Sequence, residues 1–261
     1  MTYSTIQLES EGPIARIWLN RPEVRNAFNS VMIRELGAAI EAVAKSDSLR
    51  VLVLSGRGDS FCAGADLNWM REVVRFSFEQ NLEESLQLAE LLHRLFTLPK
   101  PTIARVNGPA IGGGVGLVAA CDIVVASEAA RFGLSEVKLG LVPAVISPYV
   151  LRRIGVSRTR EYFLTGERFE ARRALEIELA NAVAAPQALD EKVREIIERL
   201  LSSGPVASAR CKELIARVSG LSLEEAKPYT ARMIAELRVS EEGQEGMAAF
   251  LEKRKARWVE P

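Results

Sequence analysis

The sequence of 261 residues is poor in the residues from which many catalytic and metal sites are built. It has one histidine, His93, and three cysteines, Cys62, Cys121 and Cys211, with no CxxC spacing. A disulfide framework and a zinc site are therefore disfavoured, and a reducing, cytoplasmic location is expected. A serine hydrolase triad or a histidine-ligated metal site would have to use His93, which falls in a charged stretch with helical spacing.

The chain also lacks net charge, long apolar runs and the common phosphate-binding motifs. Its 34 basic residues balance its 34 acidic ones, so no overall field favours nucleic acid or an anionic membrane. The N-terminus is polar and no apolar run reaches membrane-spanning length, so neither a signal peptide nor a transmembrane helix is expected. The glycine-rich stretches match neither a P-loop nor the GxGxxG spacing of a dinucleotide site.

The length suits one α/β domain, or one such domain with a helical appendage. Apolar runs predict strands at 6–8, 14–19, 51–55, 102–106, 123–126 and 183–186. Apolar residues at helical spacing predict helices at 31–45, from 67 to about 96 with a break near 76–78, and at 117–120, 147–154, 157–164 and 168–177. Asn29 or Ser30 is expected to cap the first of them. Beyond residue 188 the pattern is helical throughout, at 190–201, 206–218, 222–239 and 240–255. We therefore expect a βα body over 1–188 and a helical region over 189–261.

Two glycine-containing loops follow predicted strands. They are FCAGAD, at 61–66, and IGGG, at 111–114. If their strands are neighbours in a parallel sheet, both loops lie at the strands' carboxyl ends, where open α/β sheets bind ligands. Glycine leaves backbone N–H groups uncovered, and a helix N-terminus favours negative charge. Two such amides could form an oxyanion hole, worth roughly 3–4 kcal/mol per donor. The alternative for each loop is a tight turn with close helix packing.

Five segments resemble one known family in order and over essentially the whole chain. They are FCAGADL, VNGPAIGGGVGL, CDIVVAS, FGLSEVKLGLVP and EGMAAFLEKRKARW, and the family is the crotonase (enoyl-CoA hydratase/isomerase) superfamily. The segments NAFNSVMIREL and GADLNWM are most similar to its bacterial methylglutaconyl-CoA hydratase-like branch. The resemblance implies an α/β fold, a crotonase-type spiral of ββα units with a C-terminal helical trimerisation region. It further implies a homotrimer or dimer of trimers, an acyl-CoA thioester substrate, and neither a metal nor a cofactor beyond the coenzyme A of the substrate.

The motif positions also imply roles for single residues. The backbone N–H groups of Ala63 and Gly113 are the expected oxyanion donors, and Glu136 is the expected acid/base. A second glutamate, typical of the family's hydratases, would fall at Gly116, which can neither hold a water nor move a proton. The residues expected to bind substrate or CoA are Arg25, Ala27, Ala65, Asp66, Leu67, Gly112, Ser135, Pro143 and Lys253. Of these, Lys253 is expected to bind the CoA of a neighbouring subunit.

Three functions remain open on the sequence. The first is hydration or dehydration across the 2,3 double bond of an enoyl-CoA, with branched thioesters such as 3-methylglutaconyl-CoA as candidates. The second is Δ3-Δ2 isomerisation, which needs only the one carboxylate of Glu136. The third is a non-catalytic member that binds CoA thioesters after losing the glutamate at Gly116.

Overall fold

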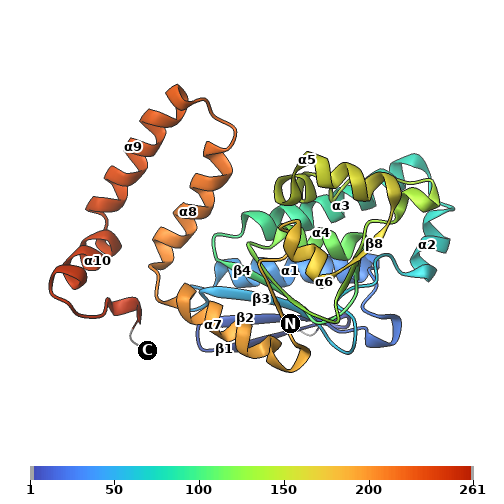
Figure 1. Cartoon of the computed structure of the whole chain (residues 1–261), viewed down its shortest axis with the longest axis horizontal. Coiled ribbons are helices and arrows are strands. Elements are labelled where there is room, and N and C mark those ends of the chain that lie inside the picture. The colour runs from blue at the N-terminus through green and yellow to red at the C-terminus, as the bar shows by residue number, and fades with distance from the viewer. Residues whose placement is uncertain (1–2, 260–261) are drawn as a thin grey trace.

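The computed structural model describes residues 3–259, which form a body and a C-terminal arm (Figure 1). The body contains a six-stranded sheet of order β1-β2-β3-β4-β6-β9. Strands β1 and β2 are antiparallel, and each later neighbouring pair in this sheet is parallel. The strands are β1 (Ile6–Glu11), β2 (Ile14–Leu19), β3 (Val51–Gly56), β4 (Thr102–Val106), β6 (Ile123–Ser127) and β9 (Ala182–Ala184).

Helices cover both faces of this sheet. One core joins the sheet to α1 (Ser30–Lys45), α3 (Phe78–Thr97), α4 (Gly113–Ala120) and α5 (Ser147–Thr165). A second core joins Val51, Val53 and Ile103 of the opposite face to Leu189 and Val193 of α7 (Leu189–Leu201). Every residue of β3 is buried, as its unbroken apolar run predicts. Asn29 caps α1, as expected, by accepting from the Met32 amide at 2.9 Å.

A second, three-stranded sheet was not predicted. It has the order β5-β7-β8 and consists of β5 (Ala110–Ile111), β7 (Arg131–Gly133) and β8 (Arg168–Glu170). The helix predicted at 168–177 is wrong over its first turn, because Phe169 pairs with Phe132 across the strands and their rings stack at 5.6 Å. Only α6 (Ala171–Glu176) is helical there. Since β5 leads into α4 and β7 leads towards Glu136, this small sheet positions both parts of the candidate site.

Other boundaries differ from expectation where glycine is involved. Helix α4 begins at Gly113 rather than at 117. Helix α5 spans both predicted helices and kinks between them at Gly155, where φ is 72° and ψ is 168°. The predicted break near 76–78 is confirmed, since α2 (Leu67–Val73) ends before it and α3 begins at Phe78. Short 3-10 helices lie at Pro22–Val24, Glu136–Leu139, Pro186–Ala188 and Arg257–Val259.

The arm consists of α8 (Pro205–Val218), α9 (Leu223–Val239) and α10 (Glu241–Leu251), and extends away from the body (Figure 1). Helix α7, which we expected to begin the helical region, packs on the sheet instead. Large apolar side chains of the arm are exposed, among them Ile215, Leu223 and Phe250. Exposed apolar side chains of this size are what an interface with another molecule would cover. No helix within residues 3–259 is both long and apolar enough to cross a membrane.

Candidate active site

The two glycine-containing loops lie against each other. Strands β3 and β4 are parallel neighbours, so the condition for placing both loops at one sheet edge is met. The Ile111 amide donates to the Cys62 carbonyl at 2.9 Å. A Cβ added to Gly114 would lie 2.6 Å from that same carbonyl oxygen. Glycine at 114 is therefore what allows the first turn of α4 to approach the other loop.

Ala63, one of the two expected oxyanion donors, does not have a free amide. Its N–H donates to the Arg25 carbonyl at 3.0 Å. Arg25 presents this carbonyl from a turn in which it and Asn26 both have left-handed φ values, 54° and 56°. The expectation for Ala63 therefore conflicts with the hydrogen bonding, because an amide already committed to a carbonyl is a poor donor for a substrate oxygen.

Ala65, expected only to bind substrate, has the free amide instead. The Phe28 amide donates to the Gly64 carbonyl at 2.7 Å, and the Asp66 amide donates to the Phe28 carbonyl at 2.8 Å. These two bonds flank Ala65 in a parallel bridge with Phe28, so the N–H of Ala65 points away from Phe28. Within residues 3–259 it has no hydrogen-bond acceptor.

Gly113, the other expected donor, is the first residue of α4. An amide in the first turn has no partner inside its helix, and the helix dipole makes this end favourable for negative charge. The preceding residue, Gly112, has a φ of 53°, and its own amide is committed to the Gly133 carbonyl at 2.8 Å. Gly113 and Ala65 thus supply one uncommitted amide from each loop.

The Glu136 carboxylate lies against this first turn. It is carried by the short 3-10 helix that follows β7, which begins after Ser135. A Cβ added to Gly112 would lie 3.1 Å from Oε1 of Glu136. Its Oε2 is buried and has no hydrogen-bond partner in the described part of the chain. Burial raises the pKa of Glu136 above its ordinary value, and a hydrogen bond from its own backbone amide only partly opposes this. Such a group is suited to accept a proton and return it.

The position expected for a second glutamate is occupied by hydrocarbon. Gly116 lies one turn beyond Gly112, to whose carbonyl its amide donates at 3.1 Å. A Cβ added to Gly116 would lie 2.3 Å from Cγ2 of Ile146. Ile146 is 3% exposed and directly precedes α5. A side chain at 116 would therefore collide with Ile146.

Asp66 holds the site together rather than presenting its carboxylate to a ligand. It is 5% exposed, accepts the Asn68 amide at 2.7 Å as the cap of α2, and forms an ion pair with Arg21 at 2.6 Å. Burial raises its pKa, but the hydrogen bonds from Arg21 and from the α2 amides outweigh burial and lower it. Arg21 also donates to the Ala27 carbonyl at 2.7 Å, so it ties the 25–28 segment to α2.

Arg25 and Ala63 line a cavity of about 510 Å³ next to the small sheet. Two further arginines line it, Arg131 of β7 and Arg168 of β8, together with Glu170, which forms an ion pair with Arg131 at 3.0 Å. The sequence reasoning missed both, because it missed the strands that carry them. Guanidinium groups are well suited to phosphate, which they bind through paired hydrogen bonds.

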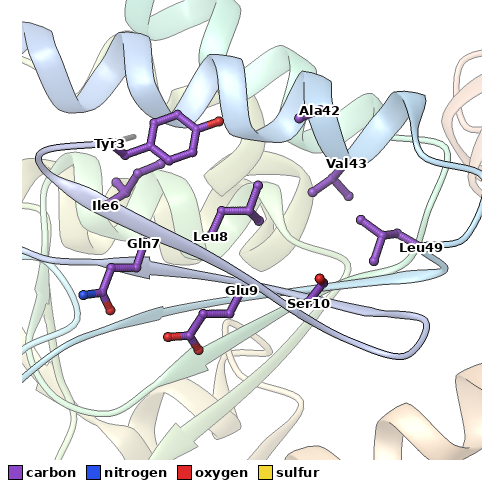
Figure 2. Close-up of a pocket in the computed structure, with 9 residues that line it drawn as sticks. All are labelled: Tyr3, Ile6, Gln7, Leu8, Glu9, Ser10, Ala42, Val43 and Leu49. Atoms are coloured by element: carbon purple, nitrogen blue, oxygen red, sulfur yellow. The ribbon is translucent and has the colours of Figure 1, made fainter. Parts of the chain in front are cut away.

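A larger hollow, of about 810 Å³, lies beside the edge strand β1 and contains none of the expected site residues (Figure 2). Leu8, Val43 and Leu49 point into the space between β1 and α1, while Gln7 and Glu9 point to the other side of the strand (Figure 2). This is the alternation of an edge strand.

The other expected residues lie at varied places. Leu67 is 70% exposed at the start of α2, and Pro143 is buried before α5. Lys253 follows α10 with a left-handed φ of 55°. Helix α10 lies in the arm, away from α2 and α5 (Figure 1).

The histidine and the cysteine of the first loop are not placed as nucleophiles, although the Cys62 backbone joins the two loops. His93 lies exposed on α3. Burial raises the pKa of the Cys62 thiol to about 12, so it stays protonated at neutral pH. Among the described residues, no cluster of three or more His, Cys, Asp or Glu could hold a metal ion.

Residues 9–261 match the enoyl-CoA hydratase/isomerase family. Among solved structures, an enoyl-CoA hydratase from Shewanella pealeana is 43% identical with a TM-score of 0.95, covering 98% of this chain and 96% of that one. AtuE from Pseudomonas aeruginosa is 37% identical with a TM-score of 0.95, over 98% and 100%. The short-chain-enoyl-CoA hydratase of Clostridium acetobutylicum is 34% identical over 98% of this chain and 97% of its own. The chain therefore belongs to the enoyl-CoA hydratase/isomerase family of the crotonase superfamily, and it is an enzyme of that family for which hydro-lyase activity is favoured.

Proposed function

We propose that this enzyme adds water to, or removes it from, the 2,3 double bond of an enoyl-CoA thioester. Branched thioesters such as 3-methylglutaconyl-CoA are candidate substrates. The observation that carries the proposal is the Glu136 carboxylate, which lies beside the first turn of α4 and has a buried oxygen with no partner in the described part of the chain. A proton-transfer group and uncommitted amides then lie at one sheet edge, as addition to a conjugated thioester requires.

The thioester oxygen is held by the amides of Gly113 and Ala65 in this proposal. Ala65 takes the role first expected of Ala63, whose amide is committed to Arg25. As water adds at C3, negative charge moves onto the thioester oxygen and forms an enolate. Two preorganised N–H donors at that oxygen stabilise the transition state by roughly 3–4 kcal/mol each.

Glu136 handles the proton in both directions. As a carboxylate it accepts one proton from the water whose oxygen bonds to C3, and it then gives that proton to C2 as the enolate collapses. The water is thereby fully consumed, and Glu136 returns to its starting state. Burial raises the pKa of Glu136, so both proton transfers are easier near neutral pH than they would be with a glutamate of ordinary pKa.

A second candidate, isomerisation from a 3-enoyl to a 2-enoyl thioester, is favoured by Ile146 at the position of a second carboxylate. A single base suffices for this reaction, because Glu136 removes a proton from C2 and returns it to C4. The amides of Gly113 and Ala65 stabilise the same enolate.

The CoA part of the substrate is assigned to the cavity lined by Arg25 and Ala63 and to a second subunit. Arg25, Arg131 and Arg168 provide cationic groups for its phosphates. Lys253 would approach from a neighbouring chain. The exposed apolar side chains of the arm support assembly as a homotrimer or a dimer of trimers.

The test is a turnover screen of crotonyl-, 3-methylcrotonyl-, 3-methylglutaconyl- and 3-hexenoyl-CoA with the wild-type enzyme and Glu136→Gln. Hydration consumes the absorbance of the conjugated thioester, whereas isomerisation of 3-hexenoyl-CoA creates it. We expect consumption with at least one 2-enoyl substrate and its loss in Glu136→Gln. Equal turnover by the two proteins would remove Glu136 from the mechanism, and binding without turnover by both would favour a non-catalytic member.

A further inference from the structure

Gly112 is the N-cap residue of α4, and Gly116 lies one turn further along, with its amide donating to the Gly112 carbonyl at 3.1 Å. Side chains on a helix lean towards its N-terminus and cover the preceding turn. A side chain at 116 would therefore extend over Gly112, where Oε1 of Glu136 lies. Position 116 is thus the place on α4 from which a second functional group would meet Glu136.

Ile146 fills that place. Its Cγ2 would be 2.3 Å, and its Cβ 3.0 Å, from a Cβ at position 116, with Cδ1 of Leu92 at 3.6 Å. The backbone of Ile146 is fixed, because its carbonyl accepts the amides of Tyr149 at 3.1 Å and Val150 at 3.2 Å in the first turn of α5. Neither the isoleucine nor its neighbours leave room for a larger group at 116 without rearrangement.

We propose that Ile146 is a specificity-determining residue, which occupies the volume of a side chain at position 116 and thereby restricts the site to the single carboxylate of Glu136. Glycine at 116 and isoleucine at 146 then form a complementary pair. The space that a side chain of α4 would fill is filled instead by a side chain from the loop before α5. This inference rests on the proposed function in that it takes Glu136 to be the acid/base.

The experiment exchanges the pair and compares Gly116→Glu, Ile146→Gly and the double variant with the wild type. Residue 146 is the N-cap of α5, where a glycine backbone is acceptable, but Ile146→Gly also removes a buried side chain and lowers stability by itself, so the single variant serves as its own reference. We expect Gly116→Glu alone to lower the urea midpoint, because Ile146 must move. Adding Ile146→Gly to that variant should restore at least half of the lost midpoint. We further expect the double variant to hydrate crotonyl-CoA at least 10-fold faster than Ile146→Gly, because a second carboxylate can position water.

Ile146→Val is the conservative control, because valine keeps the Cγ2 methyl group that fills the space; its turnover should stay within about twofold of wild type. Additive effects on the urea midpoint, or a double variant no faster than Ile146→Gly, would overturn the inference. If Gly116→Glu does not fold, Gly116→Ala with and without Ile146→Ala gives the same coupling test. The coupling in stability does not depend on turnover, so a failure of the proposed function, seen as no turnover by the wild type, is distinguished from a failure of the pairing.

Discussion

Two glycines one turn apart, Gly112 at the N-cap of α4 and Gly116 within the helix, each allow a side chain from elsewhere in the chain to lie against it. At Gly112 that side chain is Glu136, whose Oε2 is buried and has no hydrogen-bond partner among residues 3–259. At Gly116 it is Ile146, which is 3% exposed and packs as part of the core. In the proposed mechanism the first turn contributes to the chemistry, whereas the second contributes only packing. The comparison shows that a glycine beside or within a helix can indicate the close approach of another side chain. The identity of that side chain decides whether the position is functional.

The largest expected effect is at the first turn. Glu136→Gln keeps the shape of the side chain but removes its ability to take a proton, and turnover should fall by roughly 10²–10⁴-fold. The measurement is kcat on the best thioester of the screen. The matched control is Glu128→Gln, at an exposed glutamate outside the site, which should keep wild-type turnover.

Gly113 separates the loss of an N–H donor from the effect of bulk. Gly113→Pro removes the amide hydrogen at the first helical position, where proline is otherwise tolerated. Gly113→Ala keeps that hydrogen. Both variants add a Cβ, which would lie 2.9 Å from the Phe28 ring, so the bulk is matched between them. We expect Gly113→Pro to have a kcat roughly 10²–10³-fold below that of Gly113→Ala. Equal activities of the two variants would remove Gly113 from the oxyanion hole.

The second turn should respond in stability. Gly116→Ala places a Cβ against Ile146 and should lower the free energy of unfolding by about 1–3 kcal/mol, the range typical of an overpacked core. Urea unfolding gives this value. Turnover per folded molecule should change little, and a loss of turnover comparable to that of Glu136→Gln would mean that the second turn also carries chemistry.

The smallest effect is the dependence of stability on pH at Glu136. Its folded-state pKa is raised by burial, so its favourable contribution is present below the unfolded pKa and is lost as pH rises through the folded one. Glu136→Gln should therefore melt higher than wild type at pH 8 and no higher at pH 4. Thermal unfolding followed by circular dichroism at both pH values measures this. A variant less stable than wild type at pH 8 would mean that the carboxylate is well solvated or paired.

The sequence predicted the large elements because their patterns are local. The buried strand at 51–55, the cap at Asn29 and the long helices follow from runs and spacings that the folded structure keeps. The small sheet was missed because strands of two or three residues are too short to show a period, and Phe169 owes its strand conformation to Phe132.

The candidate site was predictable as a pair of loops with Glu136 nearby. The donor in the first loop was not, because its identity depends on the distant 25–28 segment, which takes the amide of Ala63 and leaves that of Ala65. The residue that fills the space at Gly116 could not be predicted from the sequence either. Ile146 is 30 residues away in sequence, and only the fold brings it to α4.

The central claim is that one carboxylate of raised pKa moves the proton. Its most direct test is the pH dependence of kcat/KM for the wild type, measured with a pantetheine thioester because this substrate lacks the ionisable phosphates of CoA. The account predicts one acid limb of unit slope, since Glu136 must be ionised to accept a proton, with a midpoint above 4.5. A limb of slope two, or a midpoint at or below 4.5, would contradict it.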